Sequence, residues 1–160
     1  MAREILRLLM LLPALLPISA AMAQSVTFLP NQNMLPVGNV NQVMQDSEGY
    51  MWYATDGGGL CRDNGFQIDV FRGDRPGSDV MKSDIVLNIA EDQSNHIWIG
   101  SMRGLYVLDK RDYSIRSIQE AAFKNIHIRA LCATHDGSVW VATGRQYAQF
   151  GSDLDKATKA

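Results

Sequence analysis

Trp52, Trp98 and Trp140 are the only tryptophans of this chain, and all three lie in the same local pattern. They stand 46 and then 42 residues apart. A repeat of about 40–45 residues, with turn residues at fixed offsets, is typical of propellers and other repeat architectures. This repeat constrains the fold more strongly than composition does, because a small sheet cannot bury both of its faces without a neighbouring copy.

Five positions keep their character when the three copies are aligned on the tryptophan. In order along the repeat, they hold Val40, Val86 and Ile128; Val43, Ile89 and Leu131; Asp46, Asp92 and Thr134; Gly49, Asn95 and Gly137; and Thr55, Ser101 and Thr143. The apolar run before the tryptophan predicts a short strand. The Asp-x-x-Gly or Asp-x-x-Asn segment predicts a tight turn, and the tryptophan lies on a second strand that faces a core.

Two further strands complete the unit. A third strand begins at Leu60 in the first copy and at Leu105 in the second, each time after a glycine-containing turn. Asp63-Asn64-Gly65 is a hairpin signal, and a fourth strand follows at residues 66–71, matched by residues 114–118 in the second copy. Four short antiparallel strands in about 40–45 residues have the size of one propeller blade.

We therefore predict an all-β fold, a partial β-propeller of two to three four-stranded antiparallel blades. The incomplete propeller covers residues 24–150, with repeats at about 38–82, 83–122 and 126–150. The large tryptophan rings suit the interface between stacked blades. A single sandwich with three coincidentally placed tryptophans is the alternative. The polar tail at residues 151–160 is predicted to be disordered.

The chain begins like a secretory signal peptide over residues 1–23. Arg3 and Arg7 give it a positive start, an apolar run follows, and Ala21-Met22-Ala23 is an A-x-A cleavage site. A membrane anchor is the alternative, but the apolar run is shorter than the roughly 20 residues that a spanning helix needs. We predict cleavage before Gln24, a periplasmic location and no membrane span in the mature chain.

Charge and cysteine content argue against several classes of partner. The formal net charge is -2, and no basic stripe is present to hold a phosphate backbone, so a nucleic acid is not an expected partner. Cys61 and Cys132 lie in apolar strand-like runs, which favours buried free thiols over the disulfide that export would permit. Neither cysteine has a histidine at metal-ligand spacing, so no metal site is predicted.

No motif for catalysis or for a cofactor was identified. The glycines at residues 57–59 lack the Gly-Lys-Ser/Thr sequence of a phosphate loop, and His135 next to Asp136 in a turn is a weak basis for catalysis. Exposed turns on a rigid scaffold can bind a ligand. Four side chains have chemistry suited to a sugar, but they would serve equally well in packing: Tyr50, Arg62, Arg103 and Tyr106. The ligand-binding residues therefore remain unknown.

Residues 43–55 followed by Gly59-Leu60 resemble the two-component regulator propeller repeat, and so do residues 89–101 followed by Gly104-Leu105-Tyr106. The signal peptide and a strand-like segment at residues 26–28 resemble the start of such proteins. The resemblance implies the periplasmic sensor region of Bacteroides-type hybrid two-component histidine kinases, which commonly detect breakdown products of polysaccharides. Their kinase has no counterpart in this chain, so the chain itself is not expected to be an enzyme.

Closed propellers typically have about 4–8 blades, whereas the sequence holds two repeats and part of a third. The expectation is therefore an N-terminal fragment of a sensor, with ligand sensing but without the kinase output. An oligosaccharide or other small ligand, the remaining propeller blades or a sensor dimer partner are the expected partners. A free-standing exported propeller module for protein or carbohydrate binding, an exported propeller enzyme, and a non-functional truncated product are the alternatives.

Overall fold

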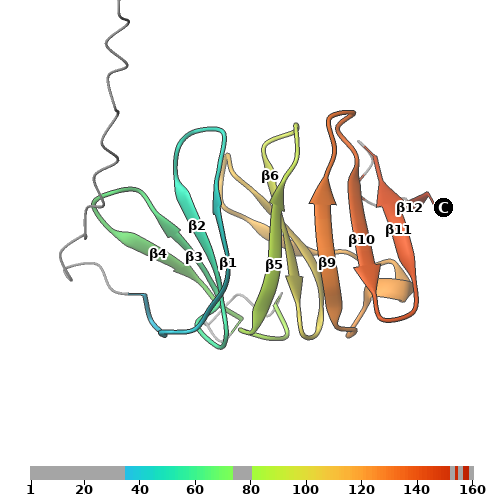
Figure 1. Cartoon of the computed structure of the whole chain (residues 1–160), viewed down its shortest axis with the longest axis horizontal. Coiled ribbons are helices and arrows are strands. Elements are labelled where there is room, and N and C mark those ends of the chain that lie inside the picture. The colour runs from blue at the N-terminus through green and yellow to red at the C-terminus, as the bar shows by residue number, and fades with distance from the viewer. Residues whose placement is uncertain (1–34, 74–80, 152–153, 155–156, 159–160) are drawn as a thin grey trace, which may run out of the picture. The chain divides into compact units, whose positions relative to one another are not determined.

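The computed structural model of the protein describes residues 35–73, 81–151, 154 and 157–158. The predicted signal peptide and the expected strand at residues 26–28 lie outside the described residues. The described part forms three antiparallel sheets of four strands, and each sheet takes its strands in sequence order (Figure 1). We call these sheets blades 1, 2 and 3. The predicted all-β propeller architecture is confirmed.

The strands follow the repeat closely. Blade 1 contains β1 (Val40–Gln45), β2 (Met51–Thr55), β3 (Leu60–Asp63) and β4 (Ile68–Phe71). Blade 2 contains β5 (Val86–Glu91), β6 (His96–Ser101), β7 (Gly104–Asp109) and β8 (Ile115–Ser117). A linker with the short 3-10 helix η2 (Ala121–Phe123) leads to blade 3, which contains β9 (Ile128–Ala133), β10 (Val139–Thr143), β11 (Tyr147–Phe150) and β12 (Ala157–Thr158).

A β-bulge recurs at the same place in the first strand of every blade. The register between the first and second strands skips Asn41 in blade 1, Leu87 in blade 2 and Arg129 in blade 3. Each of these residues lies one position after the first aliphatic residue of its repeat. Because a bulge increases local twist, this shared irregularity gives the three sheets the same local geometry.

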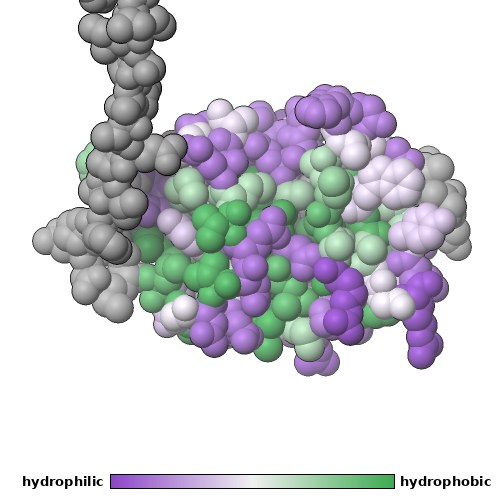
Figure 2. All heavy atoms as spheres, in the orientation of Figure 1, coloured by the Kyte–Doolittle hydropathy of each residue, from purple (hydrophilic) through white to green (hydrophobic). Residues whose placement is uncertain are grey.

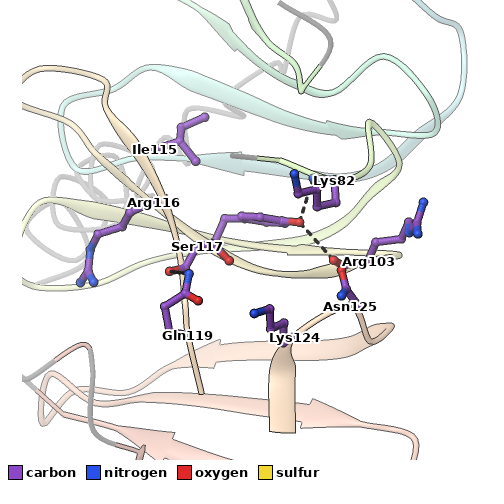
Figure 3. A pocket seen from close by; sticks show the side chains of 9 residues that line it. Lys82, Arg103, Ile115, Arg116, Ser117, Gln119, Lys124 and Asn125 are labelled. Carbon is purple, nitrogen blue, oxygen red and sulfur yellow. Dashed lines mark hydrogen bonds between the residues drawn. The ribbon is translucent and has the colours of Figure 1, made fainter. Parts of the chain in front are cut away.

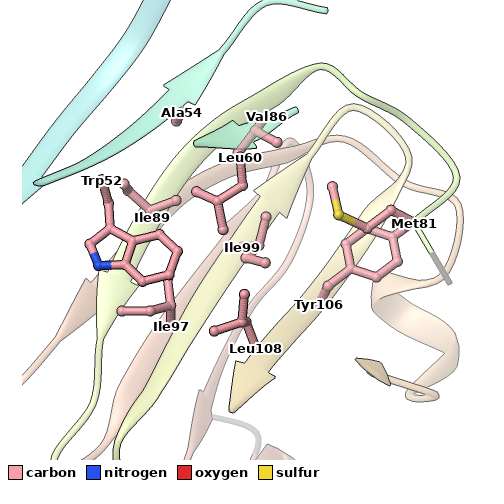
Figure 4. Packing of buried hydrophobic residues seen from close by; sticks show 10 residues of the cluster. All are labelled: Trp52, Ala54, Leu60, Met81, Val86, Ile89, Ile97, Ile99, Tyr106 and Leu108. Carbon is pink, nitrogen blue, oxygen red and sulfur yellow. The ribbon is translucent and has the colours of Figure 1, made fainter. Parts of the chain in front are cut away.

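Two apolar layers hold the blades together. In β6, Ile97 and Ile99 belong to the cluster shared with blade 1, whereas Trp98 belongs to the cluster shared with blade 3. This division follows from the alternation of side chains along a strand. Figure 4 shows the first cluster, in which the Trp52 ring lies against Ile97 and Ile89. Both faces of blade 2 are therefore covered.

The innermost strands β1, β5 and β9 lie side by side. Figure 2 shows apolar residues in the band over these strands and hydrophilic residues over the turns above them. Val40 and Val43 of β1 contribute to the exposed apolar surface, with exposed fractions of 38% and 51%. In a propeller the innermost strands face the central channel.

The three tryptophans differ in burial. Trp52 and Trp98 are fully buried, as predicted for rings between stacked blades. Trp140 is only half-buried, and its neighbour Tyr147 is 57% exposed. The expectation that every tryptophan faces a core is therefore wrong for Trp140, because no further sheet of the described chain covers that face of blade 3.

The cysteines depart from expectation in one respect. Both are free. Cys61 of β3 is fully buried, and this burial raises its pKa to about 11. Cys132 of β9 is exposed, so the prediction of a buried thiol is wrong there. It pairs opposite Trp140 in the sheet, and cross-strand partners share a face, so it lies on the same incompletely covered face.

Two strand boundaries also differ slightly from the sequence pattern. The fourth strand of blade 1 begins at Ile68 rather than Phe66, because Asn64 Oδ1 accepts the backbone N–H groups of Phe66 and Gln67 and holds them in the turn. Phe66 is consequently 88% exposed. Within the tail at residues 151–160, Ala157 and Thr158 pair with β11 as the strand β12.

Candidate functional site

The aspartate of the repeat fixes both the turn and the tryptophan in blade 1. Asp46 Oδ1 accepts the backbone N–H groups of Glu48 (3.0 Å) and Tyr50 (2.9 Å). Asp46 Oδ2 accepts the indole N–H of Trp52 at 2.8 Å. One carboxylate thus closes the turn and satisfies a buried indole donor, which would otherwise cost free energy.

Blade 2 repeats this arrangement. Asp92 Oδ1 accepts the backbone N–H groups of Ser94 (2.7 Å) and His96 (3.0 Å), and Asp92 Oδ2 accepts the indole N–H of Trp98 at 2.9 Å. We call this arrangement the Asp–Trp latch. The sequence predicted the turn but not the indole bond, although the constant spacing of six residues between aspartate and tryptophan was a signal for it.

A buried lysine gathers acidic groups of blades 1 and 2. Lys110 Nζ lies 2.6 Å from Glu91 Oε1, 3.0 Å from Glu48 Oε1 and 3.4 Å from Asp46 Oδ2, and its side chain is 3% exposed. Burial alone would lower the pKa of Lys110, but the hydrogen bonds to Glu91 and Glu48 and the nearby negative charges raise it to about 12. The lysine therefore remains charged and links the two blades.

Further polar contacts join the same two blades. Ser47 donates its backbone N–H and its hydroxyl to the Glu91 carboxylate, both at 2.7 Å. The Gln42 side chain donates to the carbonyl of Ile89 and accepts its N–H, both at 2.9 Å. Because these groups are occupied by each other, this junction is suited to holding the blades in register rather than to binding a ligand.

Two of the four side chains singled out in the sequence meet at another contact between blades 1 and 2. The Arg62 guanidinium lies over the rings of Tyr113 (4.1 Å) and Tyr50 (5.0 Å). It also pairs with Asp69 Oδ2 at 2.6 Å and donates a hydrogen bond to the Tyr113 hydroxyl. Such cation–π and ionic contacts stabilise packing. Tyr50 and Arg62 are therefore engaged within the fold.

The other two, Arg103 and Tyr106, line a pocket of about 510 Å³ at the edge of blade 2. The remaining walls come from the segment that enters this blade at Lys82, from β8, and from the linker that leaves it at residues 119–125. Figure 3 shows the side chains around this hollow. A volume in this range is typical of small-molecule sites.

Hydrogen bonds fix the floor of the pocket. The Tyr106 hydroxyl accepts the backbone N–H of Lys82 at 2.9 Å and donates to the carbonyl of Arg103 at 3.1 Å (Figure 3). An isolated antiparallel bridge between Gly104 and Lys124 holds the linker against the turn between β6 and β7. The Tyr106 hydroxyl and this bridge thus tie three of the pocket's segments together.

The charged side chains in the described pocket lining are all basic. Four basic residues line it, Lys82, Arg103, Arg116 and Lys124, and no carboxylate is among the described residues that line it. Ser117, Gln119 and Asn125 add neutral polar groups. The sequence did not indicate Lys82, Arg116 and Lys124, because they come from separate segments and only the fold brings them together.

The described residues contain no group of three or more His, Cys, Asp or Glu side chains placed to hold a metal ion. His96 Nδ1 lies 3.0 Å from Asp92 Oδ2, so this histidine takes part in the latch of blade 2. None of the helices in the described part is long and apolar enough to cross a membrane.

Comparison with known proteins identifies related sequences and folds. Residues 34–57 and 122–145 match the family model described as "Two component regulator propeller". The second segment includes much of the third repeat, whose aspartate is replaced by Thr134. No curated protein matches the sequence of this chain.

A similar solved structure is the extracellular domain of BT3049 from B. thetaiotaomicron, a protein assigned as a hybrid two component system. The TM-score is 0.64 at 20% identity over 76% of this chain, which establishes a shared fold. Two structures of the extracellular domain of BT4673 from the same organism, assigned as a one component or a hybrid two component system, have TM-scores of 0.41 at 17% identity over 76% of this chain. The chain spans 18% of the BT3049 structure and 21% of each BT4673 structure.

Proposed function

We propose that the chain is an extracytoplasmic ligand-sensing propeller region of a two-component sensor, on the premise that two of its segments match the two component regulator propeller model. The observation that carries this proposal is that the repeat model matches residues 34–57, which include β1 and β2 of blade 1, and residues 122–145, which include β9 and β10 of blade 3. The similar fold of an extracellular domain from a hybrid two component system supports it. The A-x-A site before Gln24 supports export to the periplasm.

The pocket is a suitable place for a ligand to act on such a propeller. Its lining includes Arg103 and Tyr106 of blade 2 and Lys124 of the linker to blade 3. A ligand bound there would contact the segments that enter and leave blade 2. A ligand shifts a conformational equilibrium only through a difference in its affinity for the two states. Contacts to both segments provide that difference if blade 3 changes its position relative to blade 2.

Deletion of the gene that encodes this chain tests the proposal. Transcripts are profiled in the deletion strain and its parent after exposure to a panel of small oligosaccharides. We expect one set of genes to lose its induction by one class of oligosaccharide, and the restored gene to recover it. Identical transcript profiles for every compound would contradict sensing and favour a free-standing binding module.

Export is tested separately. Periplasmic and cytoplasmic fractions are prepared from the restored strain, and the N-terminus of the recovered protein is sequenced. The expected result is a periplasmic protein that begins at Gln24. A cytoplasmic protein that retains residues 1–23 would contradict the export step on which the proposed function depends.

A further inference from the structure

Three basic residues of the pocket differ from Arg62, Lys110 and Arg111 in their partners. Arg62 pairs with Asp69, Lys110 with Glu91, and Arg111 with Asp109. By contrast, the side chains of Lys82, Arg103 and Lys124 form no ion pair within the part of the chain that the structure describes. These cations are therefore available to an anion from outside.

The pocket concentrates positive charge on a chain whose formal net charge is -2. Four cationic residues surround one hollow without a lining carboxylate among the described residues. A concave site with charges of one sign attracts counter-ions more strongly than a flat surface does. Hydrogen bonds from Lys or Arg to carboxylate or sulfate are stronger than those between neutral groups. The lining therefore favours an anionic ligand over a neutral one.

The positions of the charges limit the kind of anion. In Figure 3 the Arg103 and Arg116 side chains extend in opposite directions, and Lys82 and Lys124 lie between them. Charges spread in this way suit a molecule whose anionic groups are separated rather than a single small ion. Ser117, Gln119 and Asn125 provide donors and acceptors for hydroxyl groups of the same molecule.

We propose that the pocket at the edge of blade 2 binds a small hydroxylated organic molecule with two separated anionic groups, carboxylate or sulfate. The assignment deepens the proposed sensing function by naming the chemical class of its ligand. The anionic groups bind to the basic side chains, and the hydroxyl groups bind to the neutral polar residues of β8 and the linker.

Three probes of similar size and increasing charge test this assignment: D-glucitol, D-gluconate and D-glucarate. Each is titrated into the isotopically labelled full chain at constant ionic strength, and backbone NMR shifts are followed. We expect D-glucarate to bind at least tenfold more tightly than D-gluconate and D-glucitol to cause no saturable shift. The shifted amides should be those of Ser117, Gln119, Lys124 and Asn125. Equal binding of all three probes would overturn the proposal.

Charge-neutralising variants localise the binding. The double variant Lys82→Gln/Lys124→Gln removes two exposed pocket cations and should weaken D-glucarate binding at least tenfold. Arg145→Gln, which removes an exposed cation outside the pocket lining, should leave the affinity within twofold. Equal weakening by both variants would show non-specific attraction and overturn the site. Inorganic sulfate that displaces D-glucarate with equal affinity would also overturn it, because a single anionic group would then suffice.

The outcomes separate this site from the proposed function. Charge-dependent binding of D-glucarate in the pocket supports the binding site. If deletion of the gene then changes no transcript, the sensing function is contradicted but the binding site is still supported. Loss of induction on deletion, combined with no binding of any anionic probe, supports sensing and overturns the site.

Discussion

The junction between blades 1 and 2 and the junction between blades 2 and 3 have comparable apolar layers but different polar contacts. Each apolar layer contains a fully buried tryptophan surrounded by aliphatic and aromatic side chains. The first junction adds the Lys110 cluster, in which Lys110 contacts Asp46, Glu48 and Glu91. It also adds the two hydrogen bonds between the Gln42 side chain and the backbone of Ile89. At the second, Gln93 donates one exposed hydrogen bond to the carbonyl of His135.

Two substitutions distinguish the repeat of blade 3 from that of blade 2, and the second of them bears on this difference. Thr134 stands where blades 1 and 2 have an aspartate, and its hydroxyl bonds to Asp136 and Ser138 instead of to the indole of Trp140. Ala133 stands where blade 2 has Glu91, the residue that holds the turn of blade 1. Blade 3 therefore retains the apolar repeat while part of its polar repeat is lost.

The largest difference is expected between two tryptophan substitutions. Trp98→Ala should lower the free energy of unfolding by about 3–5 kcal/mol, because it removes a fully buried ring from between two blades. Trp140→Ala should cost about 1–2 kcal/mol, because the ring is only half-buried. Urea titration of both variants gives the comparison, and equal losses would mean that Trp140 is covered in solution.

Lys110→Met should lower the free energy of unfolding by about 3 kcal/mol, since it leaves the carboxylates of Asp46 and Glu91 partly buried without their cation. The matched change at the other junction, Gln93→Ala, removes one exposed hydrogen bond and should cost about 0.5 kcal/mol. Chemical denaturation at neutral pH measures both losses. A loss below 1 kcal/mol for Lys110→Met would contradict a role of the cluster in joining blades 1 and 2.

Substitutions in the latch should have intermediate effects. Asp92→Ala leaves the Trp98 indole and two turn amides without an acceptor, so it should cost about 1–3 kcal/mol. In the opposite direction, Thr134→Asn introduces a side-chain carbonyl that can accept the Trp140 indole N–H, and should stabilise the protein by about 0.5–1 kcal/mol. Thermal unfolding followed by circular dichroism measures both, and destabilisation by Thr134→Asn would show that the latch does not fit blade 3.

The smallest expected effect concerns the different reactivities of the two cysteines, and its test requires no substitution. Cys132 is exposed, whereas Cys61 is fully buried with its pKa raised to about 11. Because the thiolate is the reactive form, a thiol reagent at neutral pH should modify Cys132 rapidly and Cys61 only after denaturation. Mass spectrometry of the labelled peptides gives the two rates, and rapid labelling of Cys61 would indicate that blade 1 opens readily.

The local parts of this fold could be predicted from the sequence. Trp52, Asp46 and Gly49 lie within one short segment, so their spacing gives a strand, a turn and a second strand directly. Contacts between distant segments could not be predicted in this way. Lys110 follows a strand of blade 2, and nothing near it in the sequence indicates that it reaches Asp46 and Glu48 of blade 1.

The pocket shows the same limit. Arg103 and Tyr106 were recognised by chemical type, and the fold places both of them at the pocket. Tyr50 and Arg62 have the same side-chain chemistry, but they pack against each other instead. The sequence gives the type of a side chain but not the identity of its partners. Exposure of Cys132 escaped prediction for a related reason, since it depends on what covers the outer face of blade 3.

Native-state hydrogen exchange, measured residue by residue on the full chain, most directly tests the claim that polar contacts make blades 1 and 2 one tightly held unit and leave blade 3 more loosely joined. Exchange of the most protected amides requires global unfolding, whereas loosely held elements exchange through local opening. We expect the paired amides of β2 and β6 to exchange together and most slowly, and those of β10 to exchange measurably faster. Equal protection of β10 and β6 would contradict the account.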